Sequence, residues 1–188
     1  MPKAPEGPAV QFIDRLLPRY DVESSHSIRI AAPRAIVYQA ASNLDMSHSL
    51  LIRLLFRLRG LPASALRRDG LVQLCFKPLQ EEPDVGFALG VIGQFWTPHG
   101  RLVDFDPQRF SEFADPGYAK AVWCFSVEAS STETSVLTTL TRVQCLDRSS
   151  RRKFRLYWRL VGPFSGLIRS EWLRVVRKDS EALVPRST

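Results

Sequence analysis

A long amphipathic stretch near the end of the chain constrains the fold more than any other feature. Between residues 150 and 182, apolar side chains recur at steps of three and four, with one small residue, Ser165, inside the stripe. This spacing predicts one face of a long helix. The stripe consists of Phe154, Tyr157, Trp158, Val161, Ser165, Ile168, Trp172, Val175 and Val176. A helix of this length that is apolar along one side needs a broad, concave apolar surface to lie on.

The opposite face of this helix is basic. It carries Arg151, Arg152, Arg155, Arg159, Arg174, Arg177 and Lys178. Residues 1–146 contain 15 basic and 15 acidic side chains, whereas residues 147–188 contain 11 basic and 4 acidic ones, so the net charge of +7 lies in the last segment. Such a face indicates a solvated helix surface or a contact with an anionic partner. Gly162-Pro163 in mid-helix predicts a kink, because proline lacks an N–H and its ring clashes with the preceding turn.

The residues before this helix alternate between apolar and polar side chains in several short segments. These segments are 20–30, 71–77, 85–95, 101–106, 119–127 and 134–145. A period of two predicts strands of an antiparallel sheet with one buried and one solvated face. Gly86, Gly90 and Gly93 indicate bulges or bends. We therefore expect an α+β fold in which a curved antiparallel sheet wraps around the long C-terminal helix, an arrangement that can enclose a ligand cavity.

Three earlier segments have helical patterns. Residues 10–17 can form a short helix before Pro18, and Pro33 is suited to open a helix over 34–44. Residues 46–59 are apolar around most of a helical circumference, with only Arg53 and Arg57 forming a polar stripe. A helix this apolar would be wedged between the sheet and the closing helix, form a lid over a cavity, or touch a membrane.

Several classes of protein are excluded by the remaining features. No apolar run reaches the roughly 18 residues that cross a bilayer, and the first eight residues lack the apolar core of a signal peptide. We therefore expect a cytoplasmic protein. Cys75, Cys124 and Cys145 are odd in number and unclustered, which favours buried reduced thiols over disulfides or zinc ligands. No catalytic or nucleotide-binding motif occurs, so we assign no catalytic residue and expect no metal and no cofactor.

Polar residues on the inner faces of the expected strands are the best candidates for a ligand site. His26 lies on the inner side of the first strand, and Thr139 and Thr141 lie on that of the last. The aromatic residues expected to converge between sheet and helix are Phe95, Trp123, Phe125, Tyr157 and Trp158. An apolar cavity with a few placed polar groups is typical of small-ligand sites. The alternative interpretation is core packing with satisfied hydrogen bonds, which is the more common role of such residues.

Arg142 alternates with the inward Thr141 and Val143, so it should point outward and form an ion pair across the sheet. A bulge or a register slip would turn it inward, where it could bind a ligand carboxylate.

Two stretches of sequence carry a resemblance to a known superfamily. Residues Ser27 to Tyr38 combine a strand end, a small-x-Pro turn and a helix that starts at Pro33, and Phe164 to Val176 are similar to a closing helix. With this order of elements, residues 20–182 resemble the helix-grip superfamily, which includes START lipid-transfer domains, the birch-pollen allergen family and polyketide cyclases or aromatases. Features similar to an uncharacterised bacterial branch of it are Phe95-Trp96-x-Pro, Thr141-Arg142-Val143 and Tyr157-Trp158.

The resemblance implies binding of an apolar or amphipathic molecule between the sheet and the closing helix. It also implies a division into residues 1–18, a disordered or short helical N-terminal segment, and residues 19–183, a single START-like ligand-binding domain. No catalytic motif transfers to this chain.

Three hypotheses for function follow. The leading one is binding or transport of a small hydrophobic or amphipathic ligand in a cavity between sheet and helix. The second is an enzyme of the cyclase or aromatase kind, with His26 as acid or base. The third is a peripheral membrane or lipid-transfer protein that places Arg53, Arg57 and the basic C-terminal helix on anionic lipid. Nucleic acid is not an expected partner, because the basic face lacks interleaved aromatic residues and a recognised motif.

Overall fold

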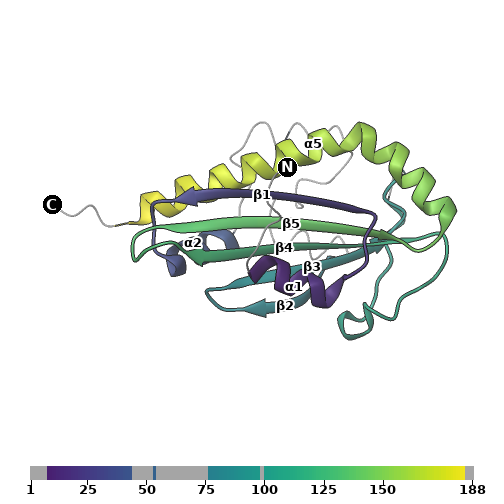
Figure 1. The fold of residues 1–188 in the computed structure, drawn as a ribbon, viewed down its shortest axis with the longest axis horizontal. Helices are drawn as coiled ribbons and strands as arrows, with labels where there is room; N and C mark the ends of the chain where they lie inside the picture. Colours follow the sequence, from purple (N-terminus) through teal and green to yellow (C-terminus); the bar gives the residue numbers. More distant parts are fainter. Residues whose placement is uncertain (1–7, 44–52, 54–75, 98–99, 185–188) are drawn as a thin grey trace.

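The computed structural model describes residues 8–43, 53, 76–97 and 100–184. Figure 1 shows strands side by side in one sheet, with a long helix running along it. The elements in chain order are α1 (Pro8–Leu16), β1 (Val22–Ile30), α2 (Arg34–Ser42), β2 (Lys77–Glu82), β3 (Gly86–Gly93), η3 (Pro107–Arg109), β4 (Ala119–Ala129), β5 (Ser135–Cys145) and α5 (Arg148–Leu183). The fold is α+β, as predicted.

The sheet is antiparallel throughout and has the strand order β1-β5-β4-β3-β2. The first strand of the chain therefore pairs with the last, and Val22 lies opposite Val143. Along β1, exposed and half-buried side chains alternate until the buried Ile30. This alternation confirms the predicted period of two and places Ser24, His26 and Ile28 on the inner face.

The C-terminal helix α5 covers the inner face of the sheet. It contacts β1, β5 and α2, and its Trp172, Leu173 and Val176 are buried. The core between α5, α2 and the sheet includes Ile30, Val37, Phe87, Leu89, Phe125, Val127 and Leu137. A curved antiparallel sheet closed by a long C-terminal helix is the helix-grip arrangement expected from the sequence.

The start of α5 is fixed by its N-cap, Asp147. The carboxylate of Asp147 accepts hydrogen bonds from the backbone N–H groups of Ser149 and Ser150, at 2.8 and 3.0 Å. The helix continues through Pro163. Figure 1 shows it bending in its N-terminal half, and proline leaves the carbonyl of Arg159 without its usual helical donor. The bend lets a helix of 36 residues follow a curved sheet.

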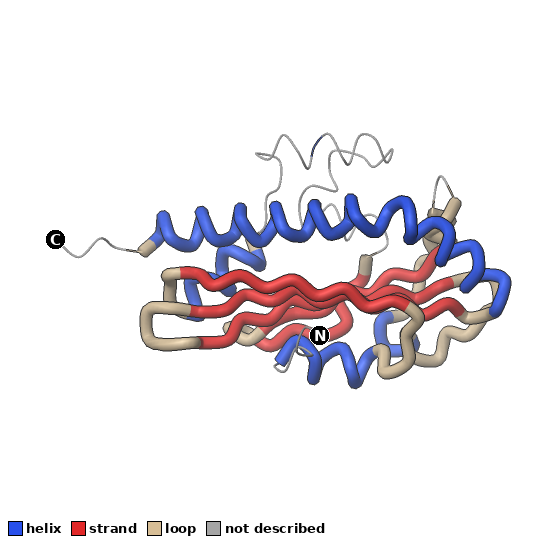
Figure 2. Tube along the Cα trace, turned by 45° about the horizontal axis from the view of Figure 1, so that its top comes forward, coloured by secondary structure: helices blue, strands red, loops and turns tan. Residues whose placement is uncertain are grey.

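The outer face of the sheet is not solvated along its whole length, contrary to the prediction. Helix α1 lies on the side of the sheet opposite α5 (Figure 2). Its Phe12 and Ile13, together with Leu17 just after the helix, form a second core with sheet residues, namely Ala88, Ile92, Val122, Cys124 and Leu140. The outward positions of β3, β4 and β5 are apolar because this helix covers them, which explains why these strands alternate less clearly than β1 does.

Two of the expected strands differ in the structure. Strand β2 covers Lys77–Glu82, whereas residues 71–75 of the expected segment lie outside the described part. Pro78 is tolerated there because β2 is an edge strand. Residues 101–106 form only one bridge, between Val103 and Ile92. The reason is that β2 already pairs with β3 from Gly86 to Gly90, so little of the edge of β3 remains free.

The apolar segment 46–59 lies outside the described residues apart from Arg53, and so does Cys75. Cys124 and Cys145 are buried and are not joined by a disulfide, as expected. Burial raises the pKa of each thiol to about 12, so both stay protonated at neutral pH.

Candidate functional site

The sheet register brings several of the expected site residues into two neighbouring rows on the inner face. In one row, His26 of β1, Thr139 of β5 and Phe125 of β4 lie directly opposite one another. In the next row, Ser24, Thr141 and Trp123 do so. Both rows face α5, so the sheet presents hydroxyl, imidazole and aromatic groups to one helix.

Trp123 and Thr139 are joined across the two rows. The indole Nε1 of Trp123 donates a hydrogen bond to Thr139 Oγ1 at 2.8 Å. The Trp123 ring centroid lies 4.7 Å from that of Phe125 and 6.0 Å from that of Trp172 on α5. The Phe125 and Trp172 centroids are 3.7 Å apart. These three rings, with Phe87 beside Phe125, form one aromatic group between the sheet and the helix.

The other expected aromatic residues form a separate group further along α5. Phe154 is buried, and its ring lies 6.4 Å from Phe95, 5.8 Å from Tyr157 and 5.7 Å from Trp158 between centroids. Phe95, Tyr157 and Trp158 are each only partly buried. The five aromatic residues therefore surround two centres, Trp172 and Phe154, rather than one.

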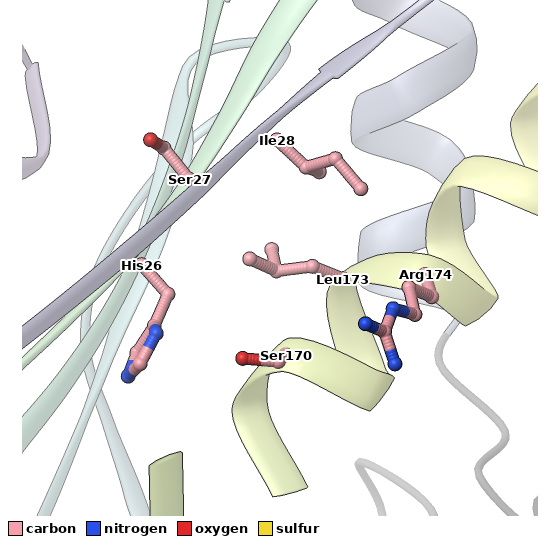
Figure 3. Close-up of a pocket in the computed structure, with 6 residues that line it drawn as sticks. All are labelled: His26, Ser27, Ile28, Ser170, Leu173 and Arg174. Atoms are coloured by element: carbon pink, nitrogen blue, oxygen red, sulfur yellow. The ribbon is translucent and has the colours of Figure 1, made fainter. Parts of the chain in front are cut away.

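A pocket opens between β1 and α5 beside the first group. Its volume is about 220 Å³, and it is lined by His26, Ser27, Ile28, Ser170, Leu173 and Arg174. Figure 3 shows His26 on the strand and Ser170 and Leu173 on the helix pointing into the space between the two elements. The His26 ring also lies close to the backbone of α5 at Gly166. A Cβ atom placed at Gly166 would lie 3.5 Å from His26 Cε1.

His26 is held neutral at pH 7 by its surroundings. Burial lowers the pKa of its imidazole, and the nearby guanidinium of Arg169 lowers it further. Its Nε2 lies 3.3 Å from Ser24 Oγ, within hydrogen-bond range. A neutral imidazole has one donor and one acceptor nitrogen, so His26 can bind a ligand through either.

Three polar atoms on this face are buried without a hydrogen-bond partner in the described part of the molecule. They are Thr141 Oγ1 on β5 and, on α5, Arg169 Nη1 and Trp172 Nε1. Thr141 is 6% exposed and Trp172 is fully buried. Buried polar atoms are nearly always hydrogen-bonded in folded proteins. Three such exceptions lie on one face within the described residues.

Arg169 was missed in the sequence analysis. Burial lowers the pKa of its guanidinium to about 10, so the side chain stays charged at neutral pH. Its position could have been found from spacing alone, because it follows Ser165 by four residues and precedes Trp172 by three. Those steps place it on the apolar stripe of the helix, where a charge is unexpected.

Arg142 lies on the other face of the sheet, as predicted, and is not part of this site. Its Nε donates to Glu23 Oε2 at 2.7 Å and its Nη1 to Asp14 Oδ1 at 2.5 Å. The expected ion pair across the sheet is present. Arg142 itself is buried beneath α1, whereas the carboxylates of Asp14 and Glu23 keep contact with solvent.

The described residues show neither a cluster suited to a metal ion nor a helix suited to cross a membrane. Residues 8–43, 53, 76–97 and 100–184 contain no group of three or more His, Cys, Asp or Glu side chains placed to hold a metal ion. Within the same residues, no helix is both long and apolar enough to cross a membrane.

Comparison with known proteins yields structural likenesses only. No family model matches the chain, and no curated protein sequence does. A conserved protein from Geobacillus kaustophilus aligns over 86% of this chain and 96% of its own, with 10% identity and a TM-score of 0.46. The ZhuI aromatase/cyclase from Streptomyces sp. R1128 aligns over 88% and 96%, with 14% identity and a TM-score of 0.31.

A third structure, the di-domain aromatase/cyclase BexL from the BE-7585A biosynthetic pathway, aligns over 86% of this chain and 47% of that one. Its identity is 14% and its TM-score is 0.31. Likenesses at these identities and scores assign neither a family nor a function, and the fold rests on the architecture described above.

Proposed function

We propose that the protein binds a small apolar or amphipathic molecule between the inner face of its sheet and α5. The observation that carries this proposal is the set of unpartnered atoms of Thr141, Arg169 and Trp172 within an aromatic interior. Leaving one such atom buried without a partner costs about 1–3 kcal/mol, and more for a charged group. A bound molecule with polar atoms would recover part of this cost.

The pocket beside His26 gives this molecule a place to enter. It lies at the sheet edge, between β1 and the turn of α5 that holds Ser170 and Leu173. Its volume of about 220 Å³ is below the usual range for drug-sized ligands, roughly 300–1,000 Å³. The described pocket therefore suits a small molecule, or one end of a larger one.

Native mass spectrometry of the purified protein, followed by denaturation and identification of any released compound, tests this proposal first. Titration with N-phenyl-1-naphthylamine, a neutral dye that fluoresces in apolar surroundings, tests it independently. The substitution Ser170→Trp fills the pocket and should abolish dye binding. The matched control is Arg177→Trp, on an exposed face of the same helix, which should bind the dye as the wild type does. Equal binding by the two variants would contradict the proposed site.

A second candidate function, docking on an anionic membrane surface, is favoured by a specific feature of α5. Four large apolar side chains on its N-terminal half face away from the sheet, and we call them the outer stripe. They are Leu156, Leu160, Phe164 and Leu167, with exposures of 65%, 69%, 55% and 43%. At 100° per residue they fall within an arc of about 80°, so they form one continuous apolar face.

The charges around the outer stripe match a surface of anionic lipid. Residues 148–170 contain seven basic side chains and no acidic one. Five of the seven are exposed, namely Arg148, Arg152, Lys153, Arg155 and Arg159. A helix with apolar residues flanked by cations is typical of segments that lie in the plane of a membrane interface. Docking through the outer stripe would bring α5, which forms one side of the pocket beside His26, into contact with lipid.

A further inference from the structure

We infer that the site takes an organic anion, whose acidic oxygen atoms are bound by Arg169. This inference rests on the proposed function and names the chemical class of the ligand. Arg169 lies on α5 three residues before Trp172, whose ring packs against Trp123 and Phe125 of the sheet. It also lies near enough to His26 to act on it electrostatically.

Arg169 carries a charge for which the described residues provide no ion-pair partner. Arg169 Nη1 is inaccessible to solvent and unbonded. Burial lowers the pKa of its guanidinium, and no carboxylate in the described residues raises that pKa. Each of the other buried cations on the opposite face has partners: Arg142 has two carboxylates, and Lys120 donates to the carbonyl oxygen of Ser111 at 3.1 Å. Arg169 as a whole is partly exposed, but a buried guanidinium nitrogen is normally hydrogen-bonded, so the partner that Nη1 lacks is best supplied by a ligand.

The neighbouring unpartnered groups point to the same class of ligand. A guanidinium and an indole nitrogen only donate hydrogen bonds, and a threonine hydroxyl can donate. The site therefore offers donors from Arg169, Trp172 and Thr141. A ligand rich in acceptors, such as a carboxylate, suits these donors, and guanidinium binds carboxylate with two parallel hydrogen bonds.

The rest of the site fits the apolar part of such a molecule. The rings of Trp123, Phe125 and Trp172 pack against one another in the same layer as the donors, so the interior around Arg169 is apolar. His26 and Ser170 line the opening. The ligand class is thus an acid with an aromatic or aliphatic body, bound with its acidic group toward α5.

The test compares two probes that differ in one group. Naphthalene-2-carboxylate and 2-naphthylmethanol have the same ring system, and only the first is anionic at pH 7. Isothermal titration calorimetry is performed on the wild type, on Arg169→Met and on a control, Arg177→Met, from an exposed position of the same helix. We expect the wild type and the control to bind the carboxylate at least about tenfold more tightly than the alcohol. Arg169→Met should bind both probes equally.

The outcomes separate this inference from the function it rests on. If the alcohol binds and the wild type shows no preference for the carboxylate, the anion inference is wrong while the binding function stands. If the preference persists in Arg169→Met, Arg169 is not the group that recognises the acid. If neither probe binds, the proposed function itself is contradicted.

Thermal unfolding without any probe gives a second, independent readout. Methionine keeps the length of the side chain and removes the unpaired charge, so Arg169→Met should raise Tm. A lower Tm would show that Arg169 already has a stabilising partner in the empty protein and would overturn the inference.

Discussion

The guanidinium of Arg142 lies 2.5 Å from Asp14 Oδ1, and this contact joins α1 to the central part of the sheet. The same side chain reaches Glu23 Oε2 at 2.7 Å, donates to the carbonyl oxygen of Leu17, and stacks over the ring of Tyr20 at 4.3 Å. One cation on β5 therefore fixes both the N-terminal helix and the edge strand β1.

Replacing Arg142 with methionine should destabilise the protein by about 2–3 kcal/mol, because two carboxylates and a carbonyl lose a buried donor. Urea unfolding measures the change. The control Arg29→Met, on the exposed side of β1, should change the free energy of unfolding by less than about 0.5 kcal/mol. Similar losses of unfolding free energy in the two variants would show that the ion pairs of Arg142 contribute little to stability.

Asp147 should contribute both a helix cap and an acid-sensitive part of the stability. Its carboxylate also accepts from the N–H of Gly117 at 2.6 Å and from the hydroxyl of Ser150. The variant Asp147→Ala should lose about 1–2 kcal/mol. Hydrogen bonds from Ser150 and Gly117 lower the pKa of Asp147 to about 2 from its ordinary 3.8.

The sign of the pH effect follows from this lowered pKa. The stabilisation from ionised Asp147 is present above pH 3.8 and is lost as the pH falls through about 2. Asp147→Asn keeps a capping oxygen, so it should cost less than the alanine variant and flatten this part of the stability curve. An unchanged acid transition in Asp147→Asn would exclude the carboxylate as its cause.

His26 should destabilise the fold when it becomes protonated. Because its pKa is below 6.5 in the folded protein, the unfolded chain binds a proton first. The free energy of unfolding should therefore fall as the pH drops from 6.5 to the folded pKa, and then level off. Among the neighbouring groups, Ser24 is uncharged and Arg169 and Arg174 are cationic. An NMR titration of the His26 ring gives the pKa directly, and Arg169→Met should raise it.

His26→Gln is the matched control for this pH dependence. Glutamine keeps a polar side chain without titrating, so the fall in stability below pH 6.5 should become smaller. A folded-state pKa at or above 6.5 would contradict the prediction.

The outer stripe of α5 predicts binding to anionic vesicles. The protein should co-sediment with vesicles that contain phosphatidylglycerol. It should stay in the supernatant with vesicles of pure phosphatidylcholine. Replacing both Leu160 and Phe164 with serine removes two exposed apolar side chains and should weaken binding more than tenfold. Each exposed basic residue changed to glutamine, such as Arg155, should weaken it by roughly 1 kcal/mol, or about fivefold. Equal binding to neutral and anionic vesicles would exclude this mechanism.

The alternation of side chains was enough to predict most of the sheet, because a period of two decides which face each residue occupies. It correctly placed His26, Thr139 and Phe125 on one face and Arg142 on the other. It could not predict that these three residues share a row, because that depends on the pairing register between strands far apart in sequence. Periodicity within one strand contains no information about its partner.

Two other features were beyond the same reasoning for physical reasons. The short helix α1 was expected near residues 10–17, but nothing in its pattern shows that it covers the outer face of the sheet. Arg169 is one of several arginines in its segment, and only its spacing places it among apolar neighbours. The outer stripe does not stand out in the sequence because its residues lie among the cations of a helix whose other face is also apolar.

The pairing of β1 with β5 also has a consequence for synthesis on the ribosome. Strand β1 ends at Ile30, and its neighbour in the described sheet begins at Ser135. At about 5–20 residues per second, β1 waits on the order of 5–20 seconds before any residue of this partner exists. The helix that covers the inner face is made later still. The nascent chain therefore exposes the apolar side of β1 for that whole time, and slower translation should lengthen its dependence on chaperones.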